Sequence, residues 1–362
     1  MPSLDLLRMN NSSLANVSEP LAPDNLSNTS SHVSPLSGPG FVVFNVVLLV
    51  VVVLPVVVLN GIILLALLLE TSTARVVRLA LGSILVSCLI VALGLAMYHI
   101  SGVILNLAPV DDPSRIPCTI TVFLLGFGGA VRLVFMATFA VTVYTVVKYR
   151  RATTLQVLAV VLAVSVILWI ASFLGASPLL SEDIVESQYV DSLSCGPRPI
   201  NLSSYIFVGL YVIFFGIGSF SITILFLVMT VCFIKSNTIS DKDVKKAMLK
   251  FGFFLLLGNG INLLGSTVPP FIAAFIVPPE RVSVKEEDMA FAEVIYIAYI
   301  MLNISLVPTP ILVPVYFKPI RKKLVYWLCC ILKRKKMPIR RSSTATSSSR
   351  ATEVVSTGVQ LI

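Results

Sequence analysis

The chain has 362 residues, of which 56% are hydrophobic and only 12% charged, and its mean hydropathy is +0.94. Soluble domains carry about 25% charged residues, so this composition argues against a water-soluble enzyme. Disordered chains are poor in aliphatic residues, which excludes disorder over most of the length. The composition therefore predicts a polytopic membrane protein.

Seven apolar stretches are long enough to cross a bilayer as helices, which takes about 20 residues at a rise of 1.5 Å each. Strands of an outer-membrane barrel would be shorter and would alternate between apolar and polar residues. The expected fold is therefore an all-α integral membrane protein, a seven-transmembrane helix bundle within residues 41–317. The predicted spans cover approximately residues 41–69, 76–101, 117–147, 154–180, 205–234, 247–277 and 290–317.

The charged residues divide unequally between the two sides of the membrane. One side, formed by 1–40, 102–116, 181–204, 278–289 and Glu293, carries 14 acidic and 5 basic residues, and the other carries 4 acidic and 21 basic residues. Cytoplasmic segments accumulate Lys and Arg, so we expect a multi-pass plasma-membrane protein with an extracellular N-terminus. The basic inner face suits anionic lipid or a cytoplasmic partner better than nucleic acid.

The segment 1–40 is polar and contains five N-glycosylation sequons, which predicts a glycosylated, disordered extracellular tail. A further sequon lies in the 181–204 loop, whereas the match at Asn303 falls within a span and is set aside. No cleavable signal pattern precedes the first span, which we expect to act as the signal anchor. The expected glycosylation sites are Asn10, Asn11, Asn16, Asn25, Asn28 and Asn201.

The residues after the last span change composition twice. Residues 318–332 mix Lys and Arg with Leu, Tyr and Trp, as in a short amphipathic helix at the membrane surface. Cys329 and Cys330 lie near its end at a depth that suits palmitoylation, the alternative being two free thiols. Residues 333–362 are basic and rich in Ser and Thr, which predicts a disordered cytoplasmic tail open to kinases.

Two of the six cysteines fall in the oxidising compartment in this topology. Cys118 lies at the outer start of the third span, and Cys195 lies in the following outer loop. They form the expected disulfide, which would stabilise the fold by about 2–4 kcal/mol.

Taken together, these features resemble the rhodopsin-like (class A) G-protein-coupled receptors, over roughly residues 41–332. Seven spans with the N-terminus outside, a Cys heading the third span and joined to the next outer loop, and a short eighth helix ending in cysteines form that family's frame. Other family markers match at the expected intervals: Asn60, Tyr144, Trp169, Pro178, Pro269, Pro310 and the pair Ile320-Arg321.

Several activation motifs of that family are altered in this chain. Thr142-Val143-Tyr144 replaces Asp-Arg-Tyr, so the arginine that would enter the G protein is missing. The aromatic switch of the sixth span and the Asn-Pro-x-x-Tyr motif of the seventh are also absent. The resemblance thus implies weak or absent conventional coupling to a heterotrimeric G protein or arrestin. The residues that would face such a partner are Thr142, Val143, Tyr144, Lys148, Arg150 and Arg151.

The resemblance also places an altered ion site inside the bundle. Cys88, with Ser83 as a rival, stands where the family has its sodium-binding Asp, and Arg132 stands on the facing side of the third span. A charge at this depth costs about 2.5–3.5 kcal/mol or more, so polar groups inside the bundle must satisfy it. The alternative is an arginine that faces lipid. The expected core polar network is Asn60, Cys88, Arg132, Asn303 and Ser305.

The ligand class implied by the resemblance is a small organic molecule. Leu125 stands where amine receptors have an Asp, and Asn303 stands where photopigments have a Lys. For His99 the alternative is a satisfied interfacial residue, and for the Gly128-Gly129 pair it is close helix packing. The candidate ligand-binding residues are Tyr98, His99, Leu125, Gly126, Gly129, Tyr211, Glu293, Tyr296 and Tyr299.

Enzyme motifs are missing from the sequence. It has no His-Glu-x-x-His, Gly-x-Ser-x-Gly or phosphate-binding loop, and only two histidines, so we expect neither catalysis nor a metal or cofactor. The expected function is a receptor with membrane lipid and a small extracellular ligand as partners. The alternatives are a non-signalling or scavenger seven-span receptor and, less favoured because no internal repeat is visible, a transporter or channel.

Overall fold

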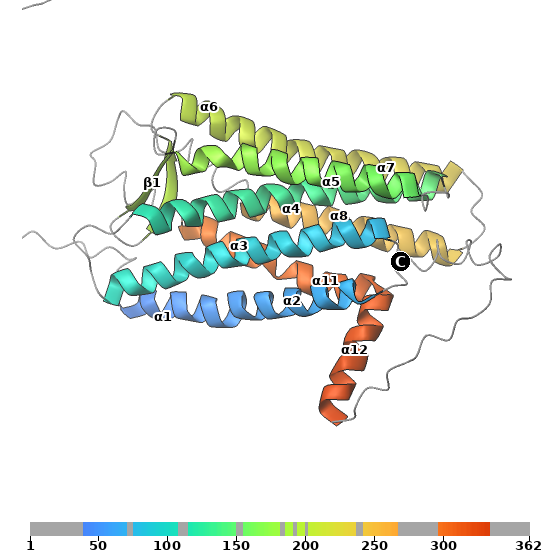
Figure 1. The fold of residues 1–362 in the computed structure, drawn as a ribbon, viewed down its shortest axis with the longest axis horizontal. Coiled ribbons are helices and arrows are strands. Elements are labelled where there is room, and N and C mark those ends of the chain that lie inside the picture. The colour runs from blue at the N-terminus through green and yellow to red at the C-terminus, as the bar shows by residue number, and fades with distance from the viewer. Residues whose placement is uncertain are drawn as a thin grey trace, which may run out of the picture. The chain divides into compact units, whose positions relative to one another are not determined.

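The computed structural model describes residues 39–70, 75–107, 115–149, 155–181, 185–190, 194–199, 202–236, 242–266 and 296–333, all within the compact unit Pro35–Ile362. In Figure 1 most helices run side by side, while α12 (Lys318–Lys333) runs across their direction. The described part is helical apart from one two-stranded hairpin.

The first span is one long helix with a wider turn in its middle. Helices α1 (Pro39–Leu48) and α2 (Leu54–Leu68) join through the π-helical turn η1 (Leu49–Val53). Pro55 follows this turn, lacks an N–H to donate and would clash with the carbonyl one turn earlier. The wider turn accommodates that proline, since π-helical turns add one residue without ending the helix.

The next elements form the middle of the chain. Helix α3 (Arg75–Leu107) is followed by α4 (Arg115–Tyr149) and by α5 (Leu155–Ala176), which ends in the 3-10 turn η2 (Ser177–Leu180). Strands β1 (Val185–Val190) and β2 (Ser194–Pro199) pair antiparallel, with Tyr189 opposite Cys195. This hairpin was not predicted, because the two prolines in β2 disfavour a strand.

The remaining elements complete the described chain. Helix α6 (Leu202–Tyr211) continues through the π-helical turn η3 (Val212–Gly218) into α7 (Ser219–Ser236), and α8 (Lys242–Ser266) follows. A helical segment at 296–306 precedes α11 (Pro308–Tyr316), which ends just before α12.

Among the described residues, six helices are long and apolar enough to cross a membrane. They match six of the seven predicted stretches, so the structure fits a multi-pass membrane protein. The apolar part of α8, Gly252–Gly265, is shorter, and residues 267–295 lie outside the described part. The sixth predicted span, 247–277, and with it the count of seven, stays a prediction. The six spans are Pro39–Leu68, Arg75–Leu107, Pro117–Thr145, Ala159–Leu180, Leu202–Lys235 and Tyr296–Tyr316.

Helices α3 and α4 form the buried centre of the described part. Helix α4 packs against α3, α5, α7 and α8, and it supplies the largest buried side chains, among them Arg132, Phe135 and Phe139. The outer helices instead expose large apolar residues such as Ile167 and Phe214. An apolar surface of this extent is unfavourable in water and is typical of contact with lipid.

Glycines allow α3 and α4 to approach closely. A Cβ added to Gly128 would lie 2.7 Å from Val91 Cγ2 and 3.1 Å from the Val91 backbone nitrogen. A Cβ on Gly94 would lie 2.9 Å from Leu125 Cδ2. Small residues commonly permit such contacts between membrane helices. Gly128 therefore serves close helix packing, which was the alternative to making room for a ligand.

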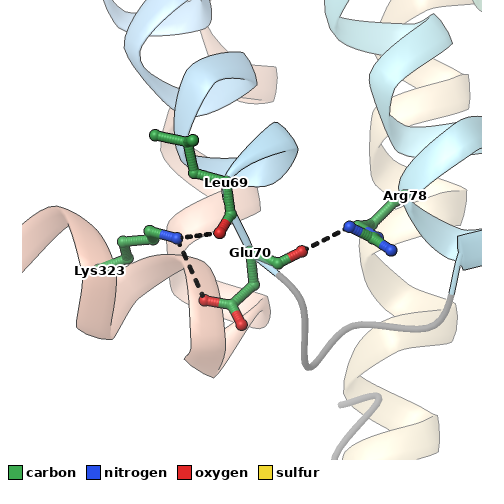
Figure 2. A network of polar contacts seen from close by, with 4 residues as sticks. All are labelled: Leu69, Glu70, Arg78 and Lys323. Carbon is green, nitrogen blue, oxygen red and sulfur yellow. Dashed lines mark hydrogen bonds and ion pairs between the residues drawn. The ribbon is translucent and has the colours of Figure 1, made fainter. Parts of the chain in front are cut away.

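A set of polar contacts holds α12 against the ends of α2 and α3 (Figure 2). Lys323 Nζ donates to the Leu69 carbonyl and lies 4.0 Å from Glu70 Oε2, while Arg78 Nη1 donates to the Glu70 carbonyl at 2.7 Å. Carbonyls at the C-terminus of a helix have no partner within the helix and carry its negative dipole end. The two cations satisfy these carbonyls, so Lys323 joins α12 and Arg78 joins α3 to the end of α2.

Candidate functional site

A polar network centred on His99 joins α1, α3 and the helical segment 296–306. His99 Nδ1 lies 2.7 Å from Asn45 Oδ1, and His99 Nε2 lies 3.2 Å from Asn303 Nδ2. All three side chains are buried. Because Asn45 presents an oxygen and Asn303 an N–H, the arrangement suits a neutral imidazole that donates from Nδ1 and accepts at Nε2.

The two asparagines are themselves held by their own helices. Asn45 Nδ2 donates to the Phe41 carbonyl at 2.9 Å, and Asn303 Nδ2 donates to the Tyr299 carbonyl at 2.8 Å. His99 is thus a satisfied buried residue, which was the alternative to a direct ligand contact. It connects three segments that are distant in sequence.

Arg132 forms a second buried polar centre, between α4 and the segment 296–306. Its side chain is 0% exposed, and Nη2 donates to Ser305 Oγ at 2.8 Å. The Ser305 hydroxyl in turn donates to the Leu302 carbonyl at 2.8 Å, so it accepts from the arginine. The free, buried thiol of Cys88 lies against the guanidinium. The arginine therefore points into the protein and not toward lipid.

Arg132 is only partly hydrogen-bonded. Nε and Nη1 have no partner among the described residues. The Asn60 side chain is also buried, but its Nδ2 donates to the Val56 carbonyl of its own helix at 3.0 Å and its Oδ1 has no described partner. Ser83, the rival of Cys88, accepts instead from Trp169 Nε1 at 3.4 Å and joins α3 to α5.

Aromatic residues surround the His99 network. The Tyr98 and Tyr299 rings stack with centroids 3.7 Å apart, and Tyr296 packs on Phe41 and Phe44 from α1. The Tyr98 hydroxyl is buried and has no hydrogen-bond partner among the described residues. Four predicted ligand residues, Tyr98, His99, Tyr296 and Tyr299, therefore gather in one region where α1, α3 and the segment 296–306 meet.

The other predicted ligand residues that the structure describes lie on α4 or, in the case of Tyr211 of α6, contact it. The Tyr211 hydroxyl donates to the Gly126 carbonyl at 2.5 Å, which joins α6 to α4. A Cβ on Gly126 would collide with Leu179, while Leu125 packs against Gly94 and Gly129 is buried within α4. Glu293 lies outside the described residues. The described residues of this set thus contribute to packing between helices.

The predicted G-protein-facing residues that the structure describes lie at the C-terminal end of α4. The Thr142 hydroxyl donates to the Thr138 carbonyl at 2.8 Å, and half-buried Val143 packs against the core. The Tyr144 ring lies edge-on to Phe226 of α7, with ring centroids 5.5 Å apart. Exposed Lys148 places its Nζ 5.5 Å from the centroid of the Tyr144 ring. Arg150 and Arg151 lie outside the described residues.

The predicted covalent modifications are described in part. Cys118 is disulfide-bonded, but the Cys195 side chain lies outside the described residues, so their pairing stays a prediction. Cys329 is a free, exposed thiol on α12, and the Cys330 side chain is not among those described. The six predicted glycosylation sites, Asn10 to Asn201, also lie outside the described part. Among the described residues, no group of three or more His, Cys, Asp or Glu side chains could hold a metal ion.

Asn45 is the functional candidate that sequence reasoning missed. It is the one polar side chain between residues 41 and 59, and that isolation in an apolar helix was an available signal. The partner of Asn45 could not be deduced, because the sequence gives depth in the membrane but not which helix lies opposite.

No family model matches the chain, and no curated protein matches it.

Proposed function

We propose that the chain is a divergent receptor of the rhodopsin-like type, with seven spans and an extracellular N-terminus. Its ligand is a small organic molecule that is neither an amine nor retinal. The observation that carries the proposal is a pair of buried polar centres, Asn45–His99–Asn303 and Arg132–Ser305, which together link α1, α3, α4 and the segment 296–306. Polar residues within membrane helices are costly and mark functional sites.

The aromatic residues around His99 supply a route from ligand to helix movement. Tyr98 precedes His99 in α3, and its stacking partner Tyr299 presents the carbonyl that holds Asn303. A ligand that bonds the Tyr98 hydroxyl and separates the two rings would shift that carbonyl. The shift would favour a different arrangement of the network, which is how a ligand changes the populations of two conformations.

Coupling on the inner side depends on electrostatics in this proposal. Val143 replaces the arginine that related receptors insert into a G protein, and it packs against the core. Lys148, Arg150, Arg151 and the basic residues from Lys242 to Lys250 remain as a positive docking surface. Anchoring to anionic lipid by the positive-inside rule is the alternative role for the same residues.

The test is nucleotide exchange on G proteins in cells that express the chain, across a chemically broad ligand panel. We expect weak agonist-driven exchange, and lower agonist potency in Tyr98→Phe, which removes only one hydroxyl. Tyr326→Phe makes the same change on exposed α12 and is the matched control. Equal potency in wild type and Tyr98→Phe would contradict the ligand region. Robust exchange unaffected by Ala at Lys148, Arg150 and Arg151 would contradict the docking surface.

A second candidate function is a receptor that binds and internalises its ligand without signalling. The position of Val143 favours it, because an apolar side chain packed against the core stands where the family has an arginine. Ligand uptake without nucleotide exchange at any G protein would distinguish this function from the first.

A further inference from the structure

The positive charge of Arg132 has no negative partner in the described protein. The six spans that the structure describes contain no Asp or Glu. Glu70, at the end of α2 and outside these spans, pairs with Lys323. A guanidinium remains charged under all physiological conditions, so deprotonation does not remove the cost of burying it.

The groups that do contact Arg132 carry no fixed charge. Ser305 accepts one hydrogen bond, and the Cys88 thiol lies against the guanidinium. Nε and Nη1, which hold most of the donors of the side chain, have no described partner. Unpaired donors on a buried charge are strongly destabilising, because both their hydration and their counter-charge have been removed.

We propose that a monovalent inorganic anion of the chloride class binds at Arg132, held by the N–H groups of Nε and Nη1 and next to the Cys88 thiol. One negative charge matches the one fixed positive charge, whereas a divalent anion would leave an excess. A small spherical ion also makes no demand on the geometry of its donors. Water alone would satisfy the donors and leave the charge unbalanced. The inference does not depend on the proposed receptor function.

The alternative counter-charge within the protein is a Cys88 thiolate. The two possibilities differ in their response to solution anions, because a thiolate pairs with Arg132 at any chloride concentration. Cys88→Ala removes the thiol and leaves the arginine and Ser305 in place. Chloride dependence that survives in Cys88→Ala therefore assigns the counter-charge to the bound anion.

The experiment is thermal unfolding of the purified full chain while sodium gluconate is replaced by sodium chloride at constant ionic strength. We expect wild type to show a saturable rise in Tm of about 2 °C or more, as ligand binding to the folded state requires. Cys88→Ala should keep that rise and Arg132→Met should lose it. A wild-type Tm independent of chloride, or an equal rise in Arg132→Met, would overturn the proposal.

A direct measurement on wild type keeps the proposal testable if Arg132→Met does not fold. Crystals grown in bromide should show an anomalous-scattering peak within hydrogen-bonding distance of the Arg132 guanidinium. Well-ordered crystals with no peak beside Arg132 would overturn the proposal. So would a wild-type Tm that is independent of chloride together with a chloride-dependent Tm in Cys88→Ala, because that pattern would assign the counter-charge to the thiolate.

Discussion

At the scale of single residues, Arg132 has the largest fully buried side chain that the structure describes. Both Arg132→Ala and Arg132→Met deprive Ser305 of its donor, but Ala leaves a void whereas Met fills most of the volume with an apolar chain. We expect Arg132→Ala to be the less stable of the two, by about 1–3 kcal/mol. Thermal unfolding of both variants at one salt composition measures the difference.

Thermal unfolding of the wild type at different sodium concentrations tests whether a sodium site is absent. With a fixed cation at Arg132 and no carboxylate on the described spans, sodium is repelled, so a sodium titration at constant chloride should leave the wild-type Tm unchanged. Sodium-dependent stabilisation, or an Arg132→Met protein less stable than Arg132→Ala, would be the contrary result.

His99 allows a second test at this scale. His99→Leu fills the position with an apolar side chain. It leaves the buried amides of Asn45 and Asn303 without their shared partner. Each buried polar group left unpaired costs about 1–3 kcal/mol, so the variant should unfold at a clearly lower temperature.

Asn106→Ala is the control for His99→Leu, because Asn106 lies on the same helix and bonds only to the Gly102 carbonyl of its own helix. The Asn106 variant should remain close to wild type in a thermal scan. Similar Tm values for the two variants would show that the network around His99 contributes nothing beyond local bonds.

The residues of the site could be predicted only in part. The inward direction of Arg132 follows from the cost of a charge in lipid, and Ser305 was among its predicted neighbours. The partners of His99 could not be identified, since α3 is apolar on all sides and its sequence does not indicate which face meets which helix.

At the scale of elements, Gly128 sets how closely α3 and α4 pack. Gly128→Ala would place a methyl group against the Val91 side chain and backbone, and such overpacking costs about 1–3 kcal/mol. Gly61→Ala is the matched control, because a Cβ there meets nothing within 4 Å and Ala is the better helix former.

Thermal scans of the two alanine variants measure this difference. Gly61→Ala should be as stable as wild type or slightly more stable, and Gly128→Ala should be less stable. If both glycine positions tolerate alanine equally, the close approach of α3 and α4 is not required for stability.

The bounds of the elements were predicted well where length determines them. The apolar run 117–147 corresponds to α4, and the predicted amphipathic segment 318–332 corresponds to α12. The π-helical turn η3 was not predicted, because the fifth span has no proline to indicate an irregular turn. Local irregularities of this kind depend on packing more than on composition.

At the scale of the whole molecule, the strongest prediction from sequence is topology. The clustered sequons and the unequal charge distribution predict an N-terminal tail outside and a C-terminal tail inside. Endoglycosidase treatment of the expressed protein should lower its apparent mass. An antibody to the C-terminal tail should stain cells only after permeabilisation, and staining of intact cells would reverse the topology.

The contacts of Lys323 with the end of α2 also have a consequence for synthesis. The ribosome completes α2 early, and the partner lysine lies 254 residues later than the Leu69 carbonyl that accepts from it. The contact therefore closes only after all intervening spans have been made. A chain that stops before residue 318 lacks this cation. The contact between α2 and α12 therefore distinguishes a complete helix bundle from a truncated one during membrane insertion.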